Sequence, residues 1–137
     1  MLFDTHAHYD DDQFDGDRET LLASLPEQGV GLVVKPGCTV ASSRTAVELA
    51  RRFPHVYAAV GIHPENCGDF RPEDQDAIRA LAREDKVVAI GEIGLDYYWP
   101  ENPPRPLQQQ VLRSQLALAR ELSLPVIIHD RDAHADT

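Results

Sequence analysis

Cysteine is scarce in this 137-residue sequence, which contains only Cys38 and Cys67. The two are isolated and show no C-x-x-C spacing, which argues against both a disulfide framework and a cysteine-based zinc site. We expect two reduced thiols, as in a cytoplasmic protein. Residues 1–4 also lack a basic segment followed by an apolar one, so we expect no signal peptide and a cytoplasmic location.

Long apolar runs are absent as well. Runs such as residues 87–90 and 126–128 fall far short of the ~20 residues that a membrane-spanning helix needs. We therefore expect no membrane partner.

Positive charge is in short supply, with 13 Lys and Arg against 23 Asp and Glu and a formal net charge of −10. A broad basic surface for nucleic acid is not expected, because such surfaces use Lys and Arg to neutralise phosphates. Phosphate chemistry would need a local source of positive charge, and a bound metal ion supplies one.

The composition is that of an ordinary globular protein, with 42% hydrophobic and 26% charged residues, and residues 1–137 are expected to form one domain. The apolar pattern alternates between strand and helix periods, which predicts an α/β fold with a parallel sheet. Strands are expected at 2–4, 31–35, 56–61, 86–91 and 124–129, and helices at 17–28, 39–53, 73–85 and 108–122. The loop 95–106 contains four prolines and is not expected to be helical.

The spacing of the predicted strands suggests a repeat. They begin about 31 residues apart, and eight such units would make about 250 residues, the usual size of a (β/α)8 barrel. Five units fit into this chain. A complete, small, doubly wound sheet is the alternative, and length alone favours it. The polar motifs favour the incomplete barrel.

Two histidines follow the first predicted strand, in Asp4-Thr5-His6-Ala7-His8. Alternate side chains of an extended segment point the same way, so His6 and His8 are expected to project together. Imidazole is a common metal ligand, and a neighbouring carboxylate such as Asp4 could orient it. Surface histidines beside a loop remain the alternative, since the pair alone is a weak signal.

Further polar residues lie at the ends of the other predicted strands: His63, Glu92 and His129. The carboxyl ends of parallel strands are where active sites of α/β proteins lie. Glu92 directly follows the apolar run 87–90, where burial of a carboxylate needs a cationic partner. We therefore predict that these residues lie together with His6 and His8 around metal.

The predicted metal ligands are His6, His8, Glu92 and His129, a nitrogen and oxygen set without thiolate. Such a set suits Zn, Mn, Fe or, less comfortably, Mg, and the sequence does not choose among them. A carboxylate can bridge two metal ions that together promote cleavage of a phosphoester, and Glu92 is the candidate bridge.

Three residues are candidates for contacting substrate. His63 could touch a phosphate or be a structural loop residue. Arg131 could clamp a phosphate through two hydrogen bonds or be an exposed charge. Asp96 could orient substrate or cap the loop that follows it. The adjacent aromatics at 97–99 could stack a nucleobase or simply pack.

Together these segments resemble the TatD family of metal-dependent deoxyribonucleases, over the whole chain and in the family's order. The resemblance implies a TIM barrel and two divalent metal ions (Mg, Mn or Zn), with His6 and His8 on one ion, His129 on the other and Glu92 as the bridging, catalytic carboxylate. It also implies hydrolysis of DNA, or of another phosphodiester, by metal-activated water. The motifs that carry it are Asp4-Thr5-His6-Ala7-His8, Gly61-Ile62-His63-Pro64, Gly91-Glu92-Ile93-Gly94-Leu95-Asp96-Tyr97-Tyr98 and residues 124–133.

Family members continue with a further ligand histidine and an aspartate, so the chain is expected to be the N-terminal part of a barrel, about five of eight units. Two alternatives to a DNase remain: a hydrolase of another ester or amide, and a truncated, inactive chain that only binds metal. An incomplete barrel would also leave the strand at 124–129 open, which allows self-association.

Overall fold

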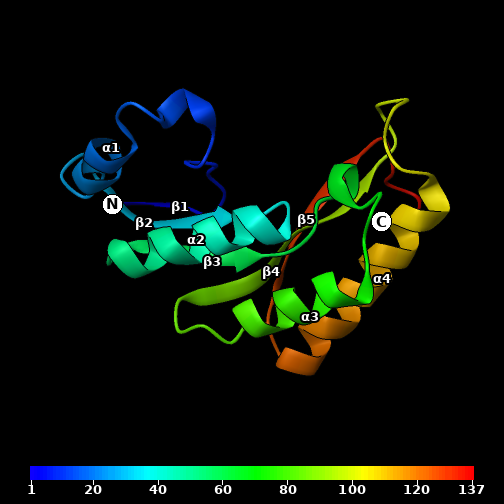
Figure 1. The fold of residues 1–137 in the computed structure, drawn as a ribbon. Coiled ribbons are helices and arrows are strands. Elements are labelled where there is room, and N and C mark those ends of the chain that lie inside the picture. The colour runs from blue at the N-terminus through cyan, green and yellow to red at the C-terminus, as the bar shows by residue number, and fades with distance from the viewer.

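The computed structural model describes residues 1–137 and contains one parallel sheet of five strands in the order β1-β2-β3-β4-β5 (Figure 1). Two short 3₁₀ turns, Asp12–Phe14 and Pro64–Asn66, lie in the loops after β1 and β3. The strands are β1 (Leu2–Asp4), β2 (Val30–Pro36), β3 (Val56–Val60), β4 (Val87–Asp96) and β5 (Val126–Arg131), and the helices are α1 (Arg18–Ser24), α2 (Val40–Arg52), α3 (Pro72–Leu81) and α4 (Arg105–Leu122).

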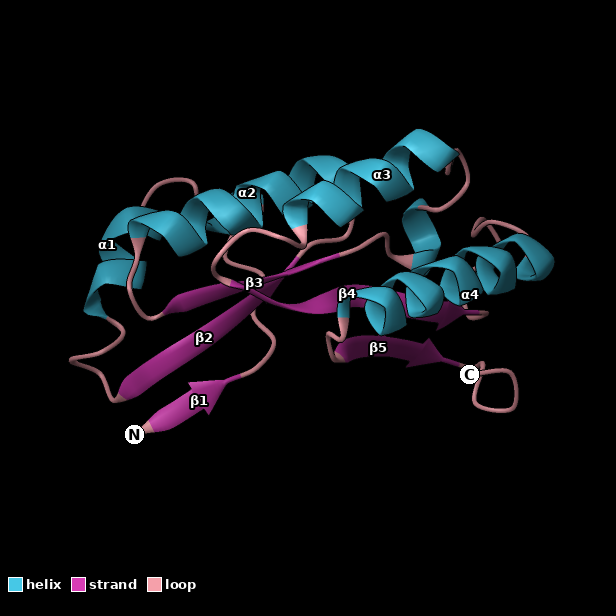
Figure 2. Ribbon diagram, turned by 90° about the horizontal axis from the view of Figure 1, so that it is seen from below, coloured by secondary structure: helices cyan, strands magenta, loops and turns pink.

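All four helices cover the same face of the sheet, as Figure 2 shows. A doubly wound sheet would carry helices on both faces and would not keep its strands in chain order. The sequential parallel order with helices on one side is the arrangement of a (β/α)8 barrel, of which five units are present. The predicted fold class is therefore confirmed, and the doubly wound alternative is wrong.

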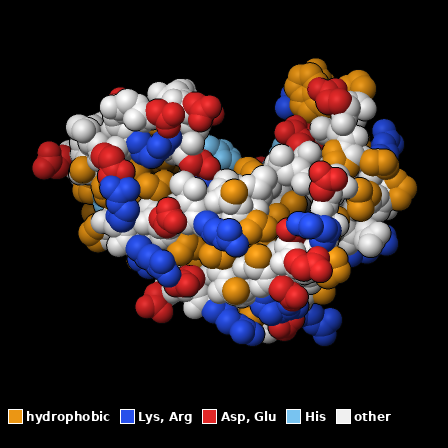
Figure 3. Space-filling view, viewed as in Figure 1, with side chains coloured by type: hydrophobic (Ala, Val, Ile, Leu, Met, Phe, Trp, Pro, Cys, Tyr) orange, Lys and Arg blue, Asp and Glu red, His pale blue; other side chains and the backbone are white.

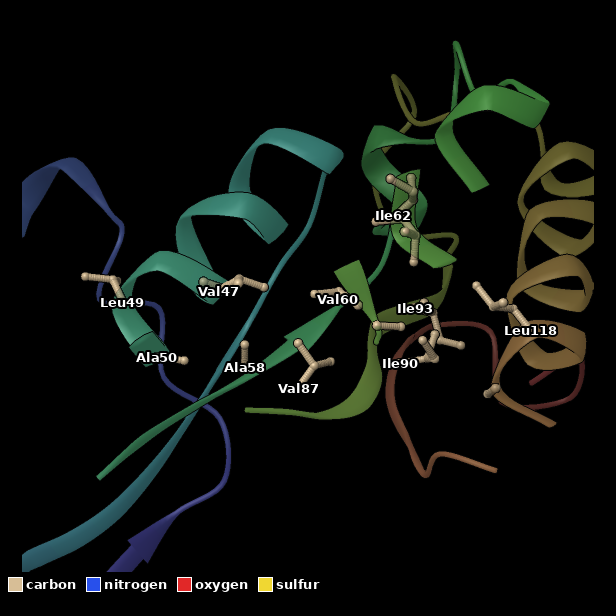
Figure 4. Packing of buried hydrophobic residues seen from close by; sticks show 14 of the residues in the cluster. Val47, Leu49, Ala50, Ala58, Val60, Ile62, Val87, Ile90, Ile93 and Leu118 are labelled. Atoms are coloured by element: carbon tan, nitrogen blue, oxygen red, sulfur yellow. The ribbon is translucent and has the colours of Figure 1, made fainter. Parts of the chain in front are cut away.

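The main core lies between the sheet and the helices (Figure 4). Val47 of α2 faces Ala58 of β3, and Leu118 of α4 faces Ile90 and Ile93 of β4. All five side chains are buried. Dense packing of this kind holds the strands rigidly, so their carboxyl ends provide fixed positions for polar side chains.

Helix α2 begins where its sequence predicts. Thr39 Oγ1 accepts a hydrogen bond from the amide of Ser42 at 3.0 Å, and Ser42 Oγ accepts one from the amide of Thr39 at 2.9 Å. This reciprocal capping satisfies two amides that have no partner inside the helix.

Several predicted boundaries need correction. Helix α1 ends at Ser24 rather than at residue 28, because Pro26 has no amide hydrogen to continue it. Strand β4 extends to Asp96 instead of ending at residue 91, because residues 93–96 pair with β5. Helix α4 begins at Arg105, so the last residues of the predicted loop 95–106 are helical; Pro106 lies in the first turn, where no amide is needed.

Strand β5 is less covered than expected. Apolar strands of a parallel sheet are usually buried on both faces, but Val126 is 37% and Ile128 41% exposed. β5 is an edge strand, and Val126 and Ile128, which point to its helix side, have no helix beyond α4 to cover them; the far face, on which Ile127 lies, carries no helix at all. On that face, Val34, Ala59 and Ala89 form only a small second cluster.

None of the helices combines the length and apolar character that crossing a membrane would require.

Candidate active site

The histidines and the carboxylate singled out by the sequence lie at one rim of the sheet. His6 and His8 follow β1, His63 follows β3, Glu92 lies within β4 and His129 within β5. Figure 3 shows histidine surface at the base of a notch between the loop after β1 (residues 5–17) and the loop after β4 (residues 97–104). The predicted gathering of these side chains is therefore confirmed, although Glu92 lies inside its strand rather than after it.

One group of ligand atoms consists of His6, His8 and Glu92. Glu92 Oε2 lies 3.1 Å from His6 Nε2 and 3.4 Å from His8 Nε2, and the two imidazole nitrogens are 3.0 Å apart. The Glu92 side chain is 8% exposed, whereas those of His6 and His8 are 37% and 39% exposed. Three atoms within 4.8 Å of one another can share one ion.

A second group lies at the other oxygen of the same carboxylate. Glu92 Oε1 lies 3.1 Å from His129 Nδ1 and 3.8 Å from His63 Nε2. Glu92 thus presents one oxygen to each group, as a bridging carboxylate would. This nitrogen and oxygen donor set, without thiolate, fits one or two divalent ions.

The charge state of the carboxylate follows from its neighbours. Burial would raise the pKa of Glu92, but hydrogen bonds from His129 and His8 and the nearby His6 and His63 outweigh it, and the net shift is downward. The hydrogen bond with Glu92 raises the pKa of His129, against the effect of burial. Glu92 is therefore an anion at neutral pH.

His63 differs from the other histidines. Burial, together with the charge of His129, lowers its pKa to about 4, so its ring is neutral at pH 7. Nδ1 accepts a hydrogen bond from the amide of Glu65 at 3.2 Å, which leaves the ring proton on Nε2. A protonated Nε2 that faces the site donates to an oxygen more readily than it binds metal. The geometry thus favours the predicted contact with substrate over a ligand role.

Asp96 has both carboxylate oxygens engaged. Oδ2 lies 2.9 Å from His129 Nε2, and Oδ1 accepts a hydrogen bond from the amide of Tyr98 at 3.0 Å. The hydrogen bonds from His129 and Tyr98 lower the pKa of Asp96 despite the opposing effect of burial. Because the residue is fully buried, the geometry favours capping of the loop over contact with substrate. Asp96 also orients His129, as carboxylates behind ligand histidines do.

The close approach of β4 and β5 at the site depends on Gly94. Its φ is +153°, and an added Cβ would overlap the carbonyl oxygen of His129. A side chain at this position would push β5, and His129 with it, away from Glu92.

Three buried polar residues that support the site were not singled out by the sequence. Gln108 of α4 bonds both backbone groups of Asp96, and Gln115 bonds both backbone groups of Ile62. Lys35 of β2 pairs with Asp10, in the loop that follows His8. The only available signal for the glutamines was a polar residue on the apolar face of a predicted helix.

Arg131 lies two residues after His129 on β5 and is exposed. Its guanidinium carbon lies 4.3 Å from the ring centre of Tyr98 and 5.3 Å from that of Trp99. No carboxylate pairs with it, so its hydrogen-bond donors are available to a ligand.

Comparison with known proteins shows similarity over nearly the whole chain. Residues 3–137 match the family described as TatD related DNase. An uncharacterized metal-dependent hydrolase, YabD of Bacillus subtilis, is 43% identical over 136 residues, which are 99% of this chain and 53% of that protein. The 3'-5' ssDNA/RNA exonuclease TatD of Salmonella typhimurium is 38% identical over 97% of this chain and 51% of its own length.

A solved structure supports the same relationship. The crystal structure of the TatD homologue YjjV from Escherichia coli superposes with a TM-score of 0.89 at 35% identity, covering 98% of this chain and 52% of that one. The chain thus spans about half the length of the relatives that it matches.

Proposed function

This chain belongs to the TatD-related DNase family, and we propose that the protein is a metal-dependent hydrolase that cleaves phosphodiester bonds of nucleic acid. The observation that carries the proposal is the position of Glu92, with one oxygen beside His6 and His8 and the other beside His129. A shared carboxylate among imidazoles is a donor set for paired divalent ions, which suit phosphoester cleavage.

Each side chain of the site has its own role in the proposed reaction. His6 and His8 with one oxygen of Glu92, and His129 with the other, would hold divalent ions such as Mg²⁺, Mn²⁺ or Zn²⁺. A bound ion supplies a Lewis acid and lowers the pKa of a coordinated water. His63 donates a hydrogen bond from Nε2–H to a substrate oxygen, and Asp96 keeps the ring of His129 in place. The guanidinium of Arg131 binds a phosphate through its free donors.

Nucleic acid is the preferred substrate for two reasons. The Salmonella relative is named as an exonuclease on single-stranded DNA and RNA. The same rim of this chain also carries an unpaired guanidinium beside exposed aromatic rings. Phosphates and bases are the ligands that such a surface recognises.

The test is metal-dependent cleavage of an end-labelled single-stranded oligonucleotide by the chain. We expect shortening of the strand with Mn²⁺ or Mg²⁺, none with EDTA, and at least about a hundredfold loss in Glu92→Gln. Glu48→Gln, an exposed position on α2, is the matched control and should behave like wild type. Cleavage of a carboxylic ester or amide with the oligonucleotide left intact would contradict the proposal and support the other hydrolase class.

Metal binding without turnover is the second candidate. It is favoured by the exposure of His6 and His8, since more than a third of each side chain is open to water. Closed active sites exclude water to strengthen their electrostatics, and this rim is open. Calorimetry that detects Mn²⁺ binding, lost in Glu92→Gln, together with no hydrolysis of any diester, ester or amide would select this candidate.

A further inference from the structure

The loop after β4 carries two exposed aromatic rings beside the site. Tyr98 is 50% and Trp99 42% exposed, and their ring centres lie 4.7 Å apart at an interplanar angle of 87°. The neighbouring Tyr97 differs, because its hydroxyl donates to Asp136 at 3.0 Å and accepts from Gln109 at 2.9 Å. Tyr97 is therefore held by the fold, whereas no side-chain hydrogen bond holds Tyr98 or Trp99.

A cation completes this surface. The guanidinium of Arg131 lies over Tyr98 at 4.3 Å and near Trp99 at 5.3 Å, with no carboxylate partner. In a chain of net charge −10, an unpaired guanidinium held by aromatic rings is a local site for an anion. Its planar group can stack on rings while its edge donates to phosphate oxygens.

Arg131 and Tyr98 each lie two residues along the chain from a residue of the site, His129 and Asp96 respectively. Arg131 and His129 are alternate residues of β5, so their side chains leave the same face of the strand, about 7 Å apart along it. Asp96, which contacts the His129 ring, accepts the amide hydrogen of Tyr98. The loop after β4 forms one side of the notch and projects beyond it in Figures 1 and 3, with hydrophobic side chains at its tip.

We propose that Tyr98, Trp99 and Arg131 form a subsite that stacks an unpaired nucleobase while its neighbouring phosphate lies at the Glu92 site. The inference rests on the proposed function and adds how the strand is recognised. Stacking needs an open base face, which a single strand offers and the interior of a duplex hides. The surface therefore selects single strands by base stacking, without reading their sequence.

The chain offers a direct probe, because Trp99 is its only tryptophan. In EDTA, where no cleavage occurs, oligothymidylate should quench the fluorescence of Trp99 in a saturable way, and an abasic oligomer of equal length should not. Labelled oligothymidylate should bind Trp99→Ala or Tyr98→Ala about five- to hundredfold more weakly by anisotropy. Trp99→Phe, which keeps a ring, should retain most of the affinity. Leu116→Ala, an exposed apolar position on α4, should match wild type.

The opposite results would overturn the subsite. These are equal affinity of Trp99→Ala and wild type, equal quenching by the abasic oligomer, or binding of a long duplex as tight as that of the single strand. An apolar peptide that quenches Trp99 when oligothymidylate does not would assign the rings to a protein partner instead. The proposed function fails separately if saturating oligothymidylate, which quenches Trp99 in EDTA, is not cleaved when Mn²⁺ or Mg²⁺ is supplied.

Discussion

The ammonium group of Lys35 lies 2.6 Å from a carboxylate oxygen of Asp10, and the Lys35 side chain is only 1% exposed. Burial lowers the pKa of Lys35, whereas the hydrogen bond and charge of Asp10 raise it, and burial prevails. The ammonium has one further acceptor, the carbonyl of Ser42, at 3.4 Å. Asp10 is therefore the main compensation for a buried cation, and the pair attaches the loop after His8 to β2.

Asp10→Asn should destabilise the fold by about 3 kcal/mol, because it leaves a buried ammonium without its counter-charge. Glu19→Gln is the control, since it breaks the pair with Arg52, in which both side chains are more than half exposed. Exposed pairs contribute at most about 1 kcal/mol. Urea unfolding measures the stability of both variants. Equal losses in the free energy of unfolding would show that the buried Lys35–Asp10 pair stabilises the fold no more than an exposed pair does.

Gly94→Ala should lower the free energy of unfolding by about 2–4 kcal/mol, because alanine resists the positive φ and its Cβ meets the backbone of β5. It should also weaken metal binding, since it displaces His129. Gly16→Ala is the matched control: nothing lies within 4 Å of the Cβ that it adds. A Gly94→Ala protein as stable as Gly16→Ala would contradict the close approach of the two strands at this point.

The features that sequence predicted well depend on local pattern. Thr39 begins a helix because capping involves residues three apart, and His6 and His63 follow strand ends because polar residues interrupt the apolar runs there. His129 was expected to end its strand at residue 129, but β5 continues to Arg131. The resemblance to a known family then linked these segments to one rim. The rim itself follows from the parallel order of the strands, which any five-unit repeat of this kind would share.

Other features depend on contacts distant in sequence. Residues 91–96 contain two glycines and resemble a turn, yet they form the second half of β4 because β5 pairs with them. In the sequence, Lys35 resembles a solvent-exposed strand residue, but in the structure it is buried and paired with Asp10. The role of Asp96 was ambiguous because its partner, His129, is 33 residues away. The roles of such residues can be assigned only when the positions of both partners in the structure are known.

Asp96→Asn should lower the affinity for Mn²⁺ about 10- to 100-fold, since carboxylates behind ligand histidines typically have effects of this size. The amide would keep the capping contact with Tyr98 but lose the negative charge that faces His129. Isothermal titration calorimetry measures the change, with Glu48→Gln as control. An unchanged affinity with intact folding would show that His129 is not held for metal by this carboxylate.

Both thiols should resist alkylation in the native protein. Burial raises the pKa of Cys67 to about 11, and burial with the charge of Glu92 raises that of Cys38 to about 11. At pH 8 only about 0.1% of each would be thiolate. Iodoacetamide should therefore modify the urea-unfolded chain much faster than the native one, as mass spectrometry can follow. Rapid native modification of Cys67, which is fully buried, would contradict the packing around it.

These raised pKa values also predict a loss of stability at high pH. The unfolded thiols release protons near pH 9 and the folded ones near pH 11, so the folded state binds more protons between these values. Their contribution to stability is complete below about pH 9 and is lost as the pH rises through 11. Replacing Cys67 with alanine should reduce this slope in urea titrations repeated across the window.

The edges of the sheet should make the chain self-associate. β1 and β5 are both edge strands, with Leu2 68%, Phe3 57% and Ile128 41% exposed. An exposed apolar edge offers unpaired backbone groups to a second copy, and a charge on the edge discourages such pairing.

Sedimentation velocity should show a mass that rises with concentration in wild type and less so in Ile128→Lys. Leu116→Lys, at an exposed site on α4, should associate like wild type. A monomer at every concentration would mean that the open edges attract no partner, and equal association of both lysine variants would place the contact away from β5.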